Sequence, residues 1–436
     1  MRKYFKALCL TVSIFLVLVL LAGCGNSGNS GNSSEPAKQE GNKEEVVNLK
    51  HWVWLDNPND PTFAQLVKEF NDTHPNIHVD VEVIGWNDFH TKLLSSVTGG
   101  SGPDTSSFKL TWQPEFIGQD ALLPLDDFLK DWAGKNDVVD NLWDVMKYSD
   151  GKHYVMPWEL QVLYMYYRPS MFKAAGINEV PKTWDEFLKA AQKLTKDTDG
   201  DGKIDQYGFG MRGARGGHEP WASFVLASVP GNTFFDDKGN CTLTTPEAVK
   251  ANQFFIDLYR KYKVVPPTAP ADGFNEIIAN FKAGKTAMVV HHIKSSNGMI
   301  EQFGDDVDAF PVPAGPQGRW TSLGDTENVI YKSTKHPKEA FTFISWLSEK
   351  EQLLRWDKAT GNVPVLKSLQ EEEYFKNNRF MRASFESMPF AHVYPINENM
   401  GEWIESLWPA VTQQALEGKI TSEEMMEKLA EGMTKK

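Results

Sequence analysis

Residues 46–83, VVNLKHWVWLDNPNDPTFAQLVKEFNDTHPNIHVDVEV, decide the fold class. Apolar residues alternate with polar ones over 47–53 and again over 77–83, which is typical of strands with one buried face. Between these stretches, apolar residues recur at helical spacing over 63–70, directly after the helix-start signal Pro61. A strand, a helix and a second strand in this order predict a right-handed βαβ unit with a parallel sheet. We therefore expect an α/β protein.

The rest of the chain adds helices and too much length for one domain. Helical spacing predicts helices over 87–97, over 184–194 and after Pro246, and Thr183 with Glu186 forms a capping box at the second of these. A chain of 436 residues exceeds the usual size of a single α/β domain. We therefore expect two lobes, each a mostly parallel sheet flanked by helices.

The first residues carry the pattern of a secretory signal. Three basic residues precede an apolar run over 7–22, which is short for a membrane-spanning helix. The run ends in Leu-Ala-Gly-Cys24, which resembles the lipobox of bacterial lipoproteins, whose cysteine becomes the acylated first residue. We expect 1–23 to be a signal peptide and Cys24 to be a lipid anchor. A cleaved signal with an incidental cysteine is the alternative.

Small and polar residues make up the segment 24–45. Its composition buries too little apolar surface to offset the entropy of ordering, so we expect a flexible tether. A tether between a lipid and a folded body would keep that body near a membrane, on the extracytoplasmic face.

The cysteine count bears on disulfide bonds, and the net charge bears on the kinds of partner. The chain has three cysteines, and removal of the signal and acylation of Cys24 would leave Cys241 alone, so no internal disulfide is expected. The formal net charge is −13, which argues against nucleic acid and against anionic ligands.

Several tryptophans stand beside carboxylates. A sugar ring has an apolar C–H face that stacks on an aromatic plane and hydroxyls that need polar partners, so these pairs suit a sugar site. The alternative for each tryptophan is a place in the core. The four pairs are Trp54 with Asp56, Trp86 with Asp88, Trp158 with Glu159, and Glu219 with Trp221.

Residues 197–205, DTDGDGKID, match the first nine positions of a calcium-binding loop. The twelfth position, where a bidentate carboxylate is usual, is Gly208, so a structural Ca²⁺ and a solvated acidic turn both remain open. The expected ligands are the side chains of Asp197, Asp199, Asp201 and Asp205 and the backbone carbonyl of Lys203.

Motifs of enzymes are missing. Gly284-Lys285-Thr286 ends like a phosphate-binding loop, but Ala279 replaces the glycine that such a loop requires, and neither H-E-x-x-H nor G-x-S-x-G occurs. His291 and His292 are adjacent and would diverge in a helix or a strand, so a metal site there is weakly supported. We expect a protein that is not an enzyme and needs no cofactor, although the paired carboxylates of a glycosidase need only meet in space.

A series of short motifs resembles the extracellular solute-binding proteins of sugar ABC importers, the family that includes maltose-binding protein. The motifs are Gly102-Pro103-Asp104, Leu122-Leu123-Pro124-Leu125, the segment 151–157, Tyr166-Tyr167-Arg168, the segment 181–187, the segment 281–288, Gly361-Asn362-Val363-Pro364 and Gly418-Lys419-Ile420-Thr421. The resemblance implies two lobes joined by crossing segments at a hinge, with the ligand between them. It implies lobe I over 46–158 and about 312–348, and lobe II over about 159–311 and 349–436.

The resemblance also implies positions for ligand contacts. Phe108 and Trp112 fall in a segment that faces the cleft, and Trp158 and Glu159 lie at the first crossover. Trp221 and Trp403 match aromatic residues that stack on sugar. His292 and Lys294 stand where the family often has a tryptophan, which leaves the size and orientation of the ligand open. Related proteins can also hold Ca²⁺ in a loop like 197–205.

These observations predict a monomeric, lipid-anchored receptor that captures a sugar or oligosaccharide and delivers it to the transmembrane subunits of an ABC permease. The alternatives are a peptide, a polyamine or a metal as the ligand, an exported glycosidase or lyase, and a scaffold that never closes.

Overall fold

The computed structural model describes residues 46–140 and 142–435. The expected signal peptide over 1–23, the lipid anchor Cys24 and the tether over 24–45 lie outside the described residues and stay predictions. Within the described ranges, no helix combines the length and the apolar character that a membrane crossing requires.

The predicted βαβ unit is confirmed. β1 (Val47–Val53) and β2 (Ile77–Val83) pair in parallel over their full length, and α1 (Thr62–Thr73) connects them. The helix buries the apolar side chains that the periodicity places on one face. α2 (Trp86–Thr98) then leads to β3 (Thr105–Phe108), which pairs in parallel with the other edge of β1.

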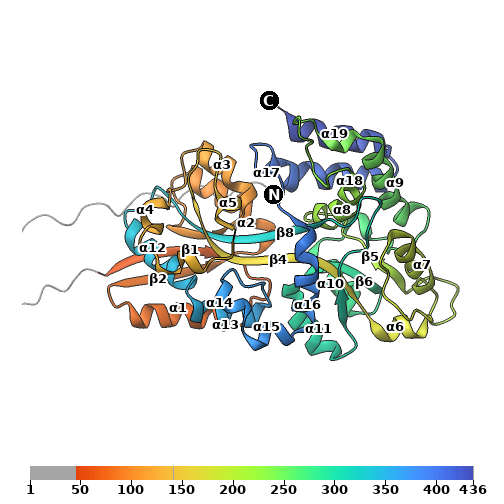
Figure 1. Ribbon diagram of the computed structural model, residues 1–436, viewed down its shortest axis with the longest axis horizontal. Helices are drawn as coiled ribbons and strands as arrows, with labels where there is room; N and C mark the ends of the chain where they lie inside the picture. Colours follow the sequence, from red (N-terminus) through yellow and green to blue (C-terminus); the bar gives the residue numbers. More distant parts are fainter. Residues whose placement is uncertain (1–45, 141, 436) are drawn as a thin grey trace, which may run out of the picture. The chain divides into compact units, whose positions relative to one another are not determined.

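Two long antiparallel strands cross the middle of the sheet. They are β4 (Val155–Tyr167) and β8 (Thr321–Ile330), and the strand order is β2-β1-β3-β8-β4-β6-β5. β6 (Thr286–His292) and β5 (Tyr207–Gly210) form a second parallel pair. In Figure 1 the crossing strands run from one group of elements to the other. The smaller strands are β7 (Asp308–Phe310), which pairs with β4, and β9 (Ala391–His392), which pairs with β8.

The apolar side chains form two cores, in agreement with the two-lobed α/β fold, and the first core extends along the crossing strand β4 to Phe281, Val289 and Ala309. The first core contains β1, β2 and β3 with α1, α2, α12 (Pro337–Leu347), α13 (Lys350–Thr360) and α16 (Arg379–Ser387). The second contains β5 and β6 with α7 (Trp184–Leu194), α8 (His218–Val225), α9 (Pro246–Arg260), α18 (Trp408–Leu416) and α19 (Ser422–Thr434).

The remaining helices connect these elements. They are α3 (Gln113–Gly118), α4 (Asp126–Leu129), α5 (Leu142–Met146), α6 (Pro169–Ala174), α10 (Phe274–Lys282), α11 (Ser296–Phe303), α14 (Lys367–Gln370), α15 (Glu373–Asn377) and α17 (Met400–Glu402). A π-helical turn, Trp403–Leu407, joins α17 to α18.

Packing of the last third of the chain differs from the expected lobe boundaries. The resemblance implies that 349–436 belongs to lobe II, yet α13 packs on α1, and Leu353 and Phe375 are buried in the first core. We propose that the chain returns to lobe I over 350–375, whereas α16 packs on β7 and on the ring of Tyr166 and stays with lobe II.

Gly208 shows why the calcium-loop pattern ends before its twelfth position. The residue lies in β5, and a Cβ added there would be 2.2 Å from the backbone oxygen of Ala191 in α7. A carboxylate side chain therefore has no room at this position, because the strand and the helix approach each other too closely.

We expect Gly208→Ala to lower the free energy of unfolding by about 1–3 kcal/mol, because the added methyl group forces α7 away from β5. Urea unfolding would measure the change. Gly118→Ala is the matched control, since Gly118 ends α3 in open space and a Cβ there meets nothing within 4 Å. Equal stability of the two variants would contradict the close approach.

Candidate ligand-binding site

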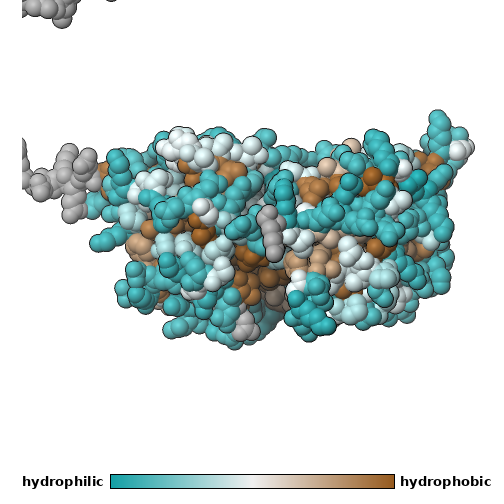
Figure 2. All heavy atoms as spheres, turned by 90° about the horizontal axis from the view of Figure 1, so that it is seen from above, coloured by the Kyte–Doolittle hydropathy of each residue, from teal (hydrophilic) through white to brown (hydrophobic). Residues whose placement is uncertain are grey.

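A cavity of about 350 Å³ is lined by residues that follow the parallel strands of both lobes. Trp54 follows β1, Trp86 follows β2 and Lys109 follows β3, while Arg212 follows β5 and His292 ends β6. Ligands of α/β proteins commonly bind at the carboxyl ends of parallel strands, where loops bring several side chains together. Figure 2 shows hydrophobic side chains reaching the surface in a hollow near the middle of the described unit.

Three of the predicted aromatic residues meet in one wall of this cavity. The ring of Trp54 lies 5.2 Å from that of Trp86 and 5.8 Å from that of Trp112, and the rings of Trp86 and Trp112 are stacked at 6.0 Å. Trp86 is half-buried, whereas Trp54 and Trp112 are almost fully covered. Phe108 does not reach the cavity, because it is fully buried and packs edge-on against Trp112 and Phe116.

An arginine and a glutamate on the lobe II side lack protein partners. The Nε of Arg212 is buried without a hydrogen bond, and the Glu219 carboxylate has neither a hydrogen bond nor an ion pair among the described residues. Burial lowers the pKa of Arg212 to about 10, so it is charged at neutral pH. Burial raises the pKa of Glu219, and the charges of Lys109 and Arg212 oppose that rise. Both side chains line the cavity and can bind a ligand.

Charged groups also line the opposite side. Lys109 donates to the backbone carbonyl of Asp325, and the carboxylate of Asp325 accepts from the backbone N–H of Leu110 at 3.2 Å. Burial raises the pKa of Asp325, while Lys109 acts to lower it. The side chain of Lys109 also lies over the rings of Trp54 and Trp86, at 6.0 and 5.7 Å from their centroids.

A buried ion pair connects the cavity to the crossing strands. Lys294 donates to Glu159 at 2.6 Å and lies 3.8 Å from Asp56, and Trp356 donates to the other oxygen of Glu159 at 2.7 Å. Burial disfavours the charge on Lys294, but Glu159 and Asp56 raise its pKa above the usual value. Asp56, His292 and Lys294 line the cavity as predicted. Glu159 does not, because it is 1% exposed and both its oxygens are taken.

The two histidines that line the cavity are neutral. Burial lowers the pKa of His218 and of His292 well below the usual range. The Nδ1 atom of each ring is buried and has no hydrogen-bond partner among the described residues. Each can therefore donate or accept a hydrogen bond without adding a charge.

The predictions for Trp158, Trp221 and Trp403 as ligand contacts need correction. Trp221 is fully buried in the second core and donates to Asn252 at 2.8 Å, and Trp403 is 1% exposed and donates to the backbone carbonyl of Leu429 at 2.8 Å. Trp158 is 1% exposed. Its ring stacks on that of Trp356 at 5.1 Å. All three rings are packed inside a lobe and leave no face for a ligand.

Sequence reasoning missed several lining residues. Lys109 directly follows a strand, so the strand-end rule that points to Trp54 could have found it. Ile404 and Glu405 reach the cavity from the π-helical turn, next to the buried Trp403. A single π-helical turn has no clear sequence pattern, although such turns recur at functional sites. Asp325 lies mid-strand in β8, where no local signal marks it.

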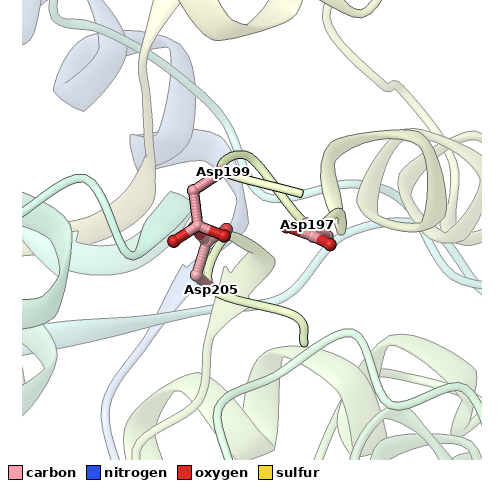
Figure 3. Close-up of side chains that lie close together, drawn as sticks. All are labelled: Asp197, Asp199 and Asp205. Atoms are coloured by element: carbon pink, nitrogen blue, oxygen red, sulfur yellow. The ribbon is translucent and has the colours of Figure 1, made fainter. Parts of the chain in front are cut away.

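The acidic loop lies apart from the cavity, since none of its residues lines it. One carboxylate oxygen each from Asp197, Asp199 and Asp205 lies within 4.8 Å of the others (Figure 3). Asp197 accepts the backbone N–H groups of Gly200 and Gly202, both at 2.7 Å, and the second of these bonds contributes most to lowering its pKa.

One of the predicted calcium ligands, Asp201, is not part of this group. Its carboxylate accepts the backbone N–H of Lys203 at 2.8 Å and does not join the other three. The backbone carbonyl of Lys203 stays a predicted ligand.

Comparisons with known proteins agree with this geometry. Residues 56–353 match the family described as bacterial extracellular solute-binding protein. A binding protein of Brucella abortus (strain 2308) is 27% identical over 338 residues, which is 77% of this chain and 80% of the relative. The arabinooligosaccharide-binding protein of Bacillus subtilis (strain 168) is 25% identical over 390 residues, or 85% of this chain and 84% of the relative.

Among solved structures, an ABC transporter solute-binding protein from Thermotoga lettingae bound with α-D-tagatose superimposes with a TM-score of 0.81. It is 25% identical, and the match covers 89% of this chain and 99% of that one.

Proposed function

The chain belongs to the bacterial extracellular solute-binding proteins, and we propose that it is the sugar-binding receptor of an ABC importer. The observation that carries the proposal is the cavity at the strand ends, which is lined by three tryptophans in mutual contact together with Arg212 and Glu219. Two relatives support a sugar as the cargo. The one from Bacillus subtilis is named for an arabinooligosaccharide, and the one from Thermotoga lettingae is bound with α-D-tagatose. After closure, both lobes would face the transmembrane subunits of the permease.

Charged groups of both signs line the cavity, and this mixture supports a neutral ligand. Arg212 and Lys109 would repel a polyamine, and Glu219 and Asp325 would repel an acidic ligand. A sugar hydroxyl both donates and accepts, so one ring can pair with Glu219 and with Arg212 at the same time. Pairing matters because an unsatisfied buried polar group costs about 1–3 kcal/mol. This requirement would also make the site reject analogues that lack a hydroxyl.

A metal as the cargo is the rival that the described residues support least. Across 46–140 and 142–435, the carboxylates of Asp197, Asp199 and Asp205 are the only group of acidic, histidine or cysteine side chains close enough to hold an ion. That group lies outside the cavity.

A screen of mono- and oligosaccharides should raise the melting temperature of the purified protein with one class of sugar, because a ligand that binds only the folded state stabilises it. Glu219→Ala should weaken that sugar about tenfold to a hundredfold in calorimetric titration, as expected for the loss of hydrogen bonds to a charged group. Glu402→Ala, an exposed glutamate on α17, should bind like the unaltered protein.

Other outcomes of the screen would identify the rivals. Stabilisation by peptides or polyamines, with no response to any sugar, would agree with a receptor function and refute a sugar as the ligand. Cleavage of the bound sugar, lost on replacing one cavity carboxylate, would instead identify a carbohydrate-active enzyme. We expect the sugar to be recovered intact.

The loop 197–205 is proposed to bind a structural Ca²⁺. Three carboxylates at mutual distances that one ion can span support it, since Ca²⁺ prefers oxygen ligands. The backbone N–H groups that hold Asp197 keep its carboxylate ionised, as an ion would need.

Addition of Ca²⁺ after chelation should raise the melting temperature by a few degrees, and Asp199→Asn should abolish the response. The asparagine oxygen can still accept the backbone N–H of Asp201, so the turn is kept while a charge is lost. The control is Asp236→Asn, in another acidic turn closed by backbone N–H groups, which should leave the response unchanged. Absence of any calcium response in the unaltered protein would show that the loop is only a solvated turn.

Lipid anchoring through Cys24 is also proposed, with 24–45 as the tether. It rests on the lipobox-like ending of the apolar run and on the extracellular place of the family. In a bacterial host, Cys24→Ser should move the protein from the membrane fraction to a soluble exported fraction, whereas Cys9→Ser should not. Retention of the Cys24→Ser variant in the membrane would refute the anchor.

A further inference from the structure

Arg215 contacts both lobes at the edge of the cavity. Its guanidinium lies 4.5 Å from the ring centroid of Trp86 and donates through Nη1 to the backbone carbonyl of the same residue at 2.9 Å. Its Nε forms an ion pair with Glu405. Trp86 begins α2 of lobe I, whereas Arg215 and Glu405 belong to segments that flank the second core.

The partners of Arg215 line the cavity, whereas Arg215 itself does not. Trp86, Glu405 and Gly216 line the cavity, but Arg215 does not. A ligand in the cavity would therefore touch both partners of the bridge without touching the arginine itself. Arg215 can therefore act on a ligand only through Trp86 and Glu405 or through the positions of the two lobes.

Partial burial makes this bridge stronger than an ordinary surface ion pair. The side chains of Arg215 and Glu405 are 19% and 13% exposed. Those of Arg355 and Glu69, which bridge α13 and α1 within the first core, are 35% and 38% exposed. Charge-assisted hydrogen bonds and a cation over an aromatic ring gain strength as water is removed. The planar guanidinium can also make all three contacts at once, which a lysine ammonium would not.

We propose that Arg215 is an interlobe latch, a positioning residue that holds the lobes together around the ligand and slows its release. All three contacts are with other residues of the protein and need no ligand. The latch therefore also holds a fraction of the ligand-free molecules in the closed state. The ligand-release part rests on the proposed sugar-binding function, and the ligand-free part does not.

With such a latch, contacts within the protein supply part of the free energy that stabilises the closed state, and contacts with the ligand supply the rest. Apparent affinity scales with the fraction of molecules that are already in the binding-competent state. Removing the latch should lower that fraction and leave Arg212 and Glu219 in the cavity, because neither is a partner of Arg215. Loss of affinity should then come mainly from faster dissociation, as is usual for changes at an interface.

Small-angle scattering of the ligand-free full chain tests the first part. We expect Arg215→Ala to increase the radius of gyration relative to the unaltered protein, and Arg215→Lys to give an intermediate value. Arg355→Ala, which removes a bridge within the first core, should give the value of the unaltered protein. Circular dichroism establishes that each variant is folded. Equal radii for Arg215→Ala and the unaltered protein would overturn the latch.

Stopped-flow dissociation of the sugar found in the screen tests the second part. We expect Arg215→Ala to release the sugar about tenfold faster, with Arg355→Ala unchanged and Arg215→Lys in between. Faster release without a change in the ligand-free scattering would also overturn the proposal, because Arg215 would then act through Trp86 or Glu405 at the cavity wall and not through closure of the lobes. If no sugar binds at all, the proposed function fails, while the scattering result still decides whether Arg215 closes the lobes.

Discussion

The antiparallel pairing of β4 with β8 is the interaction on which the rest of the structure depends. The two strands carry the chain across the middle of the sheet, and their ladder runs from Val155 opposite Val329 to Val162 opposite Leu323. A hydrogen-bonded pair resists stretching but can twist, so it fixes the distance between two lobes while permitting rotation. The register shifts between Pro157 and Glu159, where proline supplies no donor. That irregularity lies beside the ion pair of Glu159 with Lys294, which ties the strands to the cavity.

Local patterns predicted the fold because each strand and helix of the βαβ unit buries one face, and burial leaves a period in the sequence. Only some residues of the site could be predicted from the sequence. Trp54 and Asp56 come directly after a strand, so topology alone brings them to the cavity. The prediction that Trp221 contacts the ligand was wrong, because the sequence pattern of an aromatic residue beside a carboxylate is the same at a ligand site and in a core. The helix α8 decides between them: residues two apart on a helix point about 200° apart, so Glu219 in the cavity places Trp221 in the core.

Unsatisfied polar groups at the cavity are a cost that the fold alone does not explain. Among the described residues, the Nε of Arg212 is buried without a hydrogen-bond partner, and the half-buried Glu219 lines the same cavity without a protein hydrogen bond or ion pair. A buried polar atom without a hydrogen-bond partner costs about 1–3 kcal/mol. Groups that oppose stability in this way concentrate at functional sites, where a ligand supplies the missing partners. Their opposite signs favour hydroxyls, because a hydroxyl can accept a hydrogen bond from Arg212 or donate one to Glu219.

Closure in such a receptor has to be strong enough to retain the ligand and weak enough to admit it. A bridge formed within the protein favours the closed state whether or not the cavity is filled, so a bridge that is too strong would keep the ligand from entering. Partial exposure of Arg215 and Glu405 keeps the bridge within reach of water, which limits its strength. The remaining free energy of closure must then come from the ligand, and in this way retention depends on the hydroxyl contacts at Arg212 and Glu219. Specificity and closure are therefore coupled through Trp86 and Glu405, which belong both to the cavity wall and to the latch.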